Sequence, residues 1–407
     1  MMKVLFDLLI THAKHGAAEY TRRVFWALYS RIQKEKADVC IYCLYNSSSM
    51  PQYGDLLPER WNDKHVQFVD INEGIDKLNG LNCDVFFEGC AQIGGQYSEL
   101  QYLNCRSVIV FHDCVWEELY NNDLNIYMML NGEDAFRYRE TEPRGKRIYF
   151  ELKSPTIRFC RWLLYARQHG KLESGYEMLQ SSLNLLKRRD DNILITVSEY
   201  SKRSLMYNFD IKEERIAVKY SPERVFDECV EDCKDESLKS LIAKGKKYYL
   251  LVSAGRVTKN AKKTLAAFRH YVGISPDSII VTIGYGRNMY ENHVDLSFLD
   301  DSDLQIVYAN CYALIYPSYF EGFGYPPLEA MKYAKPVLSS NVCSMPEVLG
   351  DAPIYFSPIY ESAIYGALCC LTNENYQYYS EKSRQQYSQV RTKQEGDLED
   401  LINIVLK

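Results

Sequence analysis

Two glutamates eight positions apart, Glu321 and Glu329, flank a glycine-containing turn in the segment FEGFGYPPLEAMK, residues 320–332. The segment follows an apolar, strand-like run at 311–318. Its two prolines suit the first turn of a helix, because proline lacks the N–H that a helix interior needs. We therefore expect Glu321 at the end of the strand and Glu329 in the first turn of the helix. Both carboxylates would then lie at the carboxyl edge of a parallel sheet, where open α/β sheets bind ligands.

Arg256 and Lys259 lie in the segment LVSAGRVTKN, residues 251–260, which we expect to connect a strand to a helix. A guanidinium offers a bidentate fork to phosphate oxygens, and an ammonium adds a point charge. The helix after the glycine turn would aim its N-terminal N–H groups at the same edge. These groups together favour a site for a diphosphate, the alternative being a solvated basic turn.

The sequence Asp301-Ser302-Asp303 has the D-x-D pattern that is associated with metal-bound sugar nucleotides in one class of enzymes. A structural interpretation is simpler here. Ser302 followed by Gln305 is the pattern of a capping box that opens a helix over 303–310. We therefore expect no catalytic metal and no cofactor.

The whole chain has the length and composition of a globular protein with two to three domains. Its 48 basic and 54 acidic residues leave a net charge of −6, which argues against a general nucleic-acid binder. The 13 cysteines are scattered, as in a reducing compartment. No segment has the apolar length of a signal peptide or a membrane span, so we expect a cytoplasmic protein.

Strand-like and helical runs alternate along both halves of the chain, the pattern of βαβ units with a parallel sheet. The first series has strands at 3–10, 38–45, 66–70, 84–89, 107–113 and 193–199, with a helix at about 17–34. A second series starts at 215–220 and has strands at 247–255, 278–286, 311–318, 336–340 and 353–358. We expect an α/β protein with two Rossmann-like domains that face each other across a cleft.

The predicted boundaries place a first domain at 1–218 and a second at 219–385. A C-terminal helix at 386–407 would pack back towards the first domain.

The segments at 251–260 and 299–358, together with HD at 112–113 and TVSEYSKRSL at 196–205, resemble the retaining glycosyltransferases of family 4, which have the GT-B fold. The E-x7-E pattern from Glu321 to Glu329, followed by PV and PEVLGDA, carries most of the resemblance. It covers roughly 110 residues, whereas the amino-terminal half matches only at isolated points.

The resemblance implies that 1–218 is the acceptor-side domain and 219–385 the nucleotide-sugar-binding domain. It also implies a role for each matching residue. Glu329 would hold the ribose hydroxyls of the donor, and Glu321 would contact the donor sugar. The backbone of Gly322, Phe323 and Gly324 would approach its hydroxyls. Arg256 and Lys259 would stabilise the leaving diphosphate; the family's lysine is commonly farther from the arginine, so Lys262 or Lys263 is the alternative.

In the amino-terminal half, the resemblance places His112 near the donor sugar, with a structural histidine as the alternative. Gly16 corresponds to the family's amino-terminal glycine loop, which lies near the acceptor and the phosphates. Ser198 and Lys202, in VSEYSK, would either face the acceptor or simply pack.

Residues 137–189 hold 13 basic and 5 acidic residues, a local charge of +8. Helical periodicity gathers basic and aromatic side chains of this insert within one arc: Arg158, Arg161, Trp162, Tyr165 and His169. Such a face suits an anionic membrane surface, at the inner face of the plasma membrane, or a phosphate-bearing lipid acceptor. A solvated basic face with Trp162 in the core is the alternative.

These observations predict a hexosyltransferase. It would move a hexose from a nucleotide-diphosphate sugar to a surface polysaccharide or lipid-linked glycan, forming an α-linkage without metal. A sugar-nucleotide epimerase of GT-B fold is one alternative, and it would release free nucleotide without an acceptor. A non-catalytic nucleotide-sugar-binding subunit is another, although the intact Glu321, Glu329, Arg256 and Lys259 argue against it.

Overall fold

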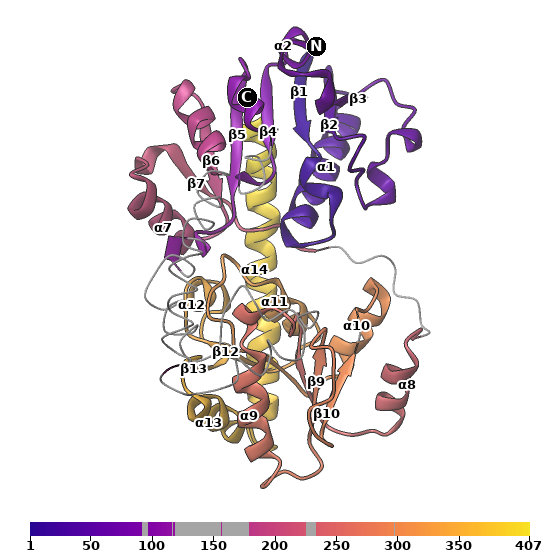
Figure 1. Ribbon diagram of the computed structural model, residues 1–407, viewed down its shortest axis with the longest axis vertical. Coiled ribbons are helices and arrows are strands. Elements are labelled where there is room, and N and C mark those ends of the chain that lie inside the picture. The colour runs from indigo at the N-terminus through magenta and orange to yellow at the C-terminus, as the bar shows by residue number, and fades with distance from the viewer. Residues whose placement is uncertain (92–96, 116, 119–155, 157–178, 225–232, 297) are drawn as a thin grey trace. The chain divides into compact units, whose positions relative to one another are not determined.

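The computed structural model describes all of residues 1–407 except 92–96, 116, 119–155, 157–178, 225–232 and 297. The chain forms two compact units (Figure 1). The first consists of the described residues within Met1–Trp116, Gly170–Val225 and Arg391–Lys407. The second consists of those within Glu117–His169 and Phe226–Val390.

The first unit contains a seven-stranded sheet in the order β3-β2-β1-β4-β5-β6-β7. All its neighbouring strands pair in parallel. Its strands are β1 (Met2–Asp7), β2 (Val39–Tyr45), β3 (Val66–Asp70), β4 (Val85–Glu88), β5 (Arg106–Phe111), β6 (Ile193–Thr196) and β7 (Ile216–Val218). The central strands are apolar on both faces, as expected where helices cover both sides of a parallel sheet.

Strand β7 corrects one expectation from the sequence. The run at 215–220 was predicted to begin the second series of strands, but β7 pairs with β6 and completes the first sheet. A strand's own residues show that it is buried in a sheet; they do not show which sheet it joins.

Helices of the first unit begin and end at local signals. The ring of His15 accepts a hydrogen bond from the N–H of Ala18 at the start of α1, and Lys36 ends that helix in a left-handed conformation. The helices are α1 (Gly16–Glu35), α2 (Ile75–Gly80) and α7 (Glu199–Phe209), with 3-10 turns η1 (Leu9–His12), η2 (Gly54–Leu56), η3 (Pro58–Arg60), η4 (Ile71–Glu73), η5 (Ser98–Tyr102) and η7 (Glu213–Arg215).

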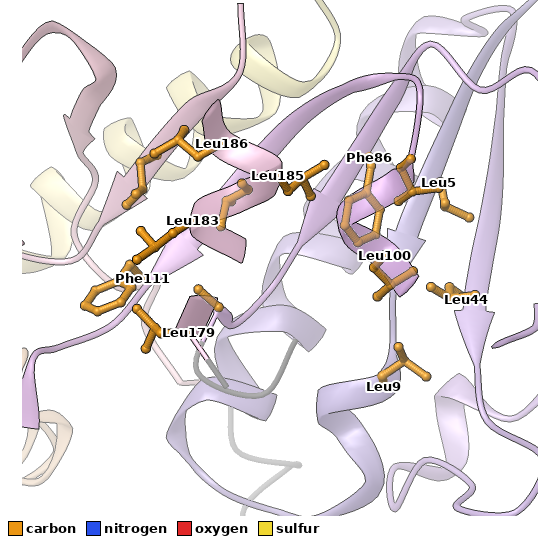
Figure 2. Packing of buried hydrophobic residues seen from close by; sticks show 14 of the residues in the cluster. Leu5, Leu9, Leu44, Phe86, Leu100, Phe111, Leu179, Leu183, Leu185 and Leu186 are labelled. Carbon is orange, nitrogen blue, oxygen red and sulfur yellow. The ribbon is translucent and has the colours of Figure 1, made fainter. Parts of the chain in front are cut away.

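The core of the first unit joins side chains from several strands to the segment that precedes β6. Leu5 and Phe86 from the centre of the sheet belong to one buried cluster with Leu100, Leu183 and Leu186 (Figure 2). This packing fixes the central strands β1, β4 and β5, whose carboxyl ends carry the polar residues described below.

The second unit contains a six-stranded parallel sheet in the order β10-β9-β8-β11-β12-β13. The strands are β8 (Tyr248–Leu251), β9 (Ile279–Ile283), β10 (His293–Leu296), β11 (Ala313–Tyr316), β12 (Val337–Ser340) and β13 (Ile354–Phe356). The prediction of two parallel α/β sheets is therefore confirmed. Strand β10 was not predicted from the sequence.

Two helix starts in the second unit differ from the prediction. Helix α10 begins at Asp301 and is capped by Asp300, whose side chain accepts a hydrogen bond from the N–H of Asp303. The prediction of a capping box that starts at Ser302 was therefore wrong. Helix α11 begins at Tyr325, which places Glu329 in its second turn. The helices are α8 (Glu236–Ala243), α9 (Ala261–Tyr271), α10 (Asp301–Asn310), α11 (Tyr325–Lys332), α12 (Met345–Leu349) and α13 (Glu361–Cys370), with the 3-10 turn η8 (Val257–Lys259).

The last helix, α14 (Tyr376–Val405), is drawn in yellow in Figure 1. Its final residues, 391–407, belong to the first unit. There the carboxylate of Asp397 accepts the backbone N–H of Tyr220 at 2.9 Å. The amide of Gln394 donates to the carbonyl of Ser221 at 2.6 Å. These bonds tie α14 to the segment that follows β7.

Candidate active site

The glycine turn after β11 has a conformation that requires glycine. Gly324 has φ of +93°, which side-chain-bearing residues rarely adopt, and a Cβ added there would lie 2.5 Å from Cε of Met345. Phe323 is buried, and its ring meets that of Tyr325 edge to face with centroids 5.7 Å apart. Gly322 is buried as well. The backbone therefore turns sharply between Glu321 and the start of α11.

Lys259, at the end of η8, reaches across to this turn. The residue is almost fully buried, with 8% of its surface exposed. The ammonium forms an ion pair with the carboxylate of Glu321 and donates a hydrogen bond to the hydroxyl of Tyr316 at 2.8 Å. The structure therefore brings together two residues that the sequence singled out, Lys259 and Glu321.

Glu329 lies close to the same group from α11. It is buried, with 7% exposed. Burial raises the pKa of Tyr316 well above its usual value, and the negative charges of Glu321 and then Glu329 raise it further. Tyr316 thus stays protonated and lies among Lys259, Glu321 and Glu329.

Arg256 is exposed and immediately precedes η8. Its carbonyl accepts the N–H of Lys259 at 2.9 Å, so the two cationic residues belong to one tight turn. Of the two alternative lysines, Lys263 donates to the carbonyl of Ile359 at 2.8 Å, and Lys262 is exposed. The geometry therefore favours Lys259 as the partner of Glu321.

In the first unit, His112 follows β5 and is half-buried against the neighbouring strand. Its Nε2 donates to the carbonyl of Gly89 at 3.0 Å, and its ring lies edge-on to Tyr20 with centroids 5.0 Å apart. Burial lowers the pKa of His112 to about 4, so the ring is neutral at pH 7. Gly16, the other predicted residue at this sheet edge, is the first residue of α1.

Sequence reasoning missed two buried carboxylates next to His112. Asp7 ends β1 and Glu88 ends β4, and these strands are neighbours with Phe6 opposite Phe87. Asp7 accepts the N–H of Leu9 at 2.7 Å.

One oxygen of Glu88 accepts the hydroxyl of Ser182 at 2.8 Å, while the other has no hydrogen-bond partner among the described residues. The signal was present in the sequence: each is a lone acid after an apolar strand run, in LFD and VFFE.

Burial raises the pKa of Asp7 to about 7 and that of Glu88 to about 8. The negative charge of Asp7 adds to the shift of Glu88. Ionising both carboxyl groups of a buried pair costs much free energy, because burial and the like charge of the neighbour both oppose it. The carboxyl edge of β1, β4 and β5 therefore holds an acid pair next to a neutral histidine.

The remaining predicted residues have structural contacts or lie outside the description. Ser198 caps α7 by accepting the N–H of Ser201 at 3.1 Å, and Lys202 pairs with Glu213 at 3.0 Å. Arg158, Arg161 and Trp162 lie outside the described residues.

The D-x-D segment has structural contacts instead of an open metal site. Asp303 accepts the backbone N–H groups of Lys234 and Asp235 at 2.8 and 2.9 Å, and Asp300 caps α10. Within the described part of the chain, no group of three or more His, Cys, Asp or Glu residues could hold a metal ion. That no metal is needed for catalysis remains a prediction.

Residues 233–356 match the family model described as "Glycosyl transferases group 1". This match contains Arg256, Lys259, Glu321 and Glu329, and therefore the whole constellation around Tyr316.

Two curated relatives match parts of the chain. It is 49% identical over 63 residues to O-antigen chain mannosyltransferase B of Escherichia coli, which is 16% of each chain. It is 30% identical over 179 residues to O-antigen chain mannosyltransferase RfbU of Salmonella typhimurium, which is 40% of this chain and 46% of that one. The chain thus spans less than half the length of these relatives.

Solved structures match over almost the whole chain. Sucrose-phosphate synthase of Thermosynechococcus elongatus has a TM-score of 0.62 at 12% identity and covers 98% of this chain and 97% of its own. Anabaena HepE in complex with UDP and glucose has a TM-score of 0.61 at 15% identity, covering 98% and 99%. At this level of identity the likeness shows the fold, and the predicted GT-B class is confirmed.

Proposed function

We propose that this protein is a retaining glycosyltransferase, similar to those of family 4, that transfers a hexose from a nucleotide-diphosphate sugar to a glycan. The observation that carries the proposal is the buried group of Lys259, Glu321, Tyr316 and Glu329, inside the segment that matches the group 1 model. The names of the curated relatives support mannose as the hexose and a surface polysaccharide as the product.

The proposed chemistry is substitution at the anomeric carbon of the donor. The bond from this carbon to the diphosphate oxygen breaks, and its electron pair leaves with the diphosphate. The acceptor hydroxyl oxygen forms the new bond on the same face, and its proton passes to a phosphate oxygen. The configuration is then retained, with an α-linked product.

Positive groups and backbone donors would stabilise the leaving diphosphate. Arg256 and Lys259 supply charge from one turn. The first turn of α11 contributes less than a helix N-terminus usually does, because Pro326 and Pro327 have no N–H. The N–H groups of the preceding glycine turn, residues 322–324, complete the set of donors. The neutral His112 suits contact with an uncharged sugar hydroxyl.

For the acceptor, we propose a surface polysaccharide or its lipid-linked precursor, met in the cytoplasm at the inner face of the plasma membrane. The charge of residues 137–189 supports contact with an anionic membrane or a phosphate-bearing lipid. In the described part of the chain, no helix has the length and apolar character needed to cross a bilayer.

The proposal is tested first by donor binding and then by transfer. A ligand that binds only the folded protein raises its melting temperature by mass action. We expect GDP or UDP and the matching mannose nucleotide to do so, and the full chain to transfer mannose to a lipid-linked glycan primer in EDTA. Binding without transfer would favour a non-catalytic subunit, and a converted free sugar nucleotide would favour an epimerase. Activity lost in EDTA and restored by Mn²⁺ would reject the metal-free route, and a β-linked product from an α-linked donor would reject retention.

Glu329→Ala is expected to weaken donor binding more than the chemical step. A carboxylate can accept two hydrogen bonds from vicinal hydroxyls, and the loss of a hydrogen bond to a charged group costs roughly 1.5–3 kcal/mol, or about 10- to 150-fold in affinity. Steady-state kinetics should show KM for the donor rising by about that factor, with kcat changed less than about threefold. An unchanged KM would contradict the ribose-binding role. The exposed Glu236 on α8, changed to Ala, is the control.

A further inference from the structure

Tyr316 lies at the centre of the proposed donor site, although neither the E-x7-E spacing nor the basic turn pointed to it. It is the last residue of β11, and only 1% of its surface is exposed. Its hydroxyl accepts a hydrogen bond from the ammonium of Lys259 at 2.8 Å and is hydrogen-bonded to Glu321. The same ammonium lies 4.6 Å from the centre of the tyrosine ring.

The two groups that hold the Lys259 ammonium, the carboxylate of Glu321 and the hydroxyl of Tyr316, differ in charge. Glu321 holds the ammonium of Lys259 through an ion pair, which offsets the positive charge that a diphosphate needs. The hydroxyl of Tyr316 is neutral, so it orients the ammonium without cancelling its charge. Burial keeps the hydroxyl protonated by raising the pKa of Tyr316 well above the usual value.

Counting donors shows what remains available to a substrate. An ammonium has three N–H donors on a flexible stem of four carbons. Among the described residues, Glu321 and Tyr316 take two of them. The third remains for a phosphate oxygen. Because two contacts already fix the ammonium, little rotational freedom is lost when the phosphate binds.

We propose that Tyr316 is a positioning residue that holds the Lys259 ammonium where negative charge develops on the leaving diphosphate. This inference rests on the proposed function of the site. It predicts that the hydroxyl acts through Lys259, so the effect of removing it depends on the presence of that lysine.

The test compares two buried tyrosines of the same sheet, each changed to phenylalanine. Tyr249 is fully buried on β8, next to β11, and its hydroxyl bonds to that of Tyr271 at 3.0 Å. Both variants lose a buried hydroxyl that takes part in hydrogen bonding. Melting temperatures measured for both show whether each variant is folded at the assay temperature.

We expect Tyr316→Phe to lower kcat by about 10- to 100-fold, with KM for the donor within about threefold of wild type, because the charge acts mainly in the transition state. Tyr249→Phe should keep kcat within about twofold. In a Lys259→Met background, adding Tyr316→Phe should change kcat by less than about twofold, since the group it positions is gone.

Three results would overturn the inference: full activity in Tyr316→Phe, an equal loss in Tyr249→Phe, or independent, multiplying effects of Tyr316→Phe and Lys259→Met. If the wild type is active and any of these results is found, the inference about Tyr316 is wrong, and the proposed function is unaffected. A wild type without transfer to any acceptor rejects the proposed function, and the inference falls with it.

Discussion

Arg256→Ala is expected to lower the turnover number by about 10²- to 10³-fold, the loss typical of removing one preorganised donor to a developing oxyanion. Arg256 is exposed and shares its turn with Lys259, whose N–H it binds through its carbonyl. The substitution leaves that backbone bond in place and removes only the guanidinium. Steady-state and single-turnover rates with saturating donor and acceptor measure the effect.

The control for Arg256→Ala is Lys246→Ala, which removes another exposed cation of the second unit before β8. A general effect of net charge would lower both rates, whereas stabilisation of the leaving diphosphate concerns Arg256 alone. Near-normal turnover in Arg256→Ala would exclude the role proposed for this residue. A raised KM with unchanged turnover would limit that role to ground-state binding.

Glu88→Gln is expected to stabilise the protein at alkaline pH, by on the order of 3 kcal/mol, because it removes one member of the buried acid pair. The folded-state pKa values of Asp7 and Glu88, about 7 and about 8, lie above the ordinary values of 3.8 and 4.5. At a pH well below 4, such carboxyl groups do not lower the free energy of unfolding, because they are protonated in both the folded and the unfolded state. The destabilisation that they cause grows as the pH rises towards the folded-state pKa values, and it is constant above them.

Denaturant unfolding between pH 5 and pH 9 measures this effect. The wild type should lose stability over that range more steeply than Glu88→Gln, whose amide can still accept from Ser182. His12, whose charge lowers the pKa of Asp7, is present in both the wild type and the variant.

The exposed Glu59, changed to Gln, is the matched control for Glu88→Gln. If Glu88→Gln and the wild type show the same pH dependence, Glu88 is ionised in the folded state without cost. The buried acid pair would then be excluded.

The sequence predicted most strands because a parallel sheet covered on both faces leaves a continuous apolar run. DVCIYCLY and SVIVFHD are such runs, and they form β2 and β5. Strand β10 was missed because HVDL is short and two of its four residues are polar. Its buried His293 is satisfied by the hydroxyl of Thr282 at 2.8 Å, a partner that no local pattern reveals.

Prediction from the sequence has the same limit at the candidate active site. The turn between Glu321 and Glu329 could be predicted, since glycine and proline have strong local preferences. The pairing of Lys259 with Glu321 joins residues 62 positions apart, and a tyrosine at the end of a strand resembles any other core residue. The acid pair of Asp7 and Glu88 depends on the order of strands in the sheet, which the linear pattern leaves open.

The contacts of α14 have a consequence for protein synthesis. The first unit needs Gln394 and Asp397 to satisfy Ser221 and Tyr220, and it buries Leu401 in the same helix. A ribosome translates these residues only after it has made the whole segment 226–390. The first unit therefore begins to emerge from the ribosome before the second unit, but it cannot complete its folding until residues 391–407 have been made. A nascent chain that stalls before residue 391 leaves this unit unfinished, with polar backbone groups unpaired, and thus exposed to chaperones and proteases.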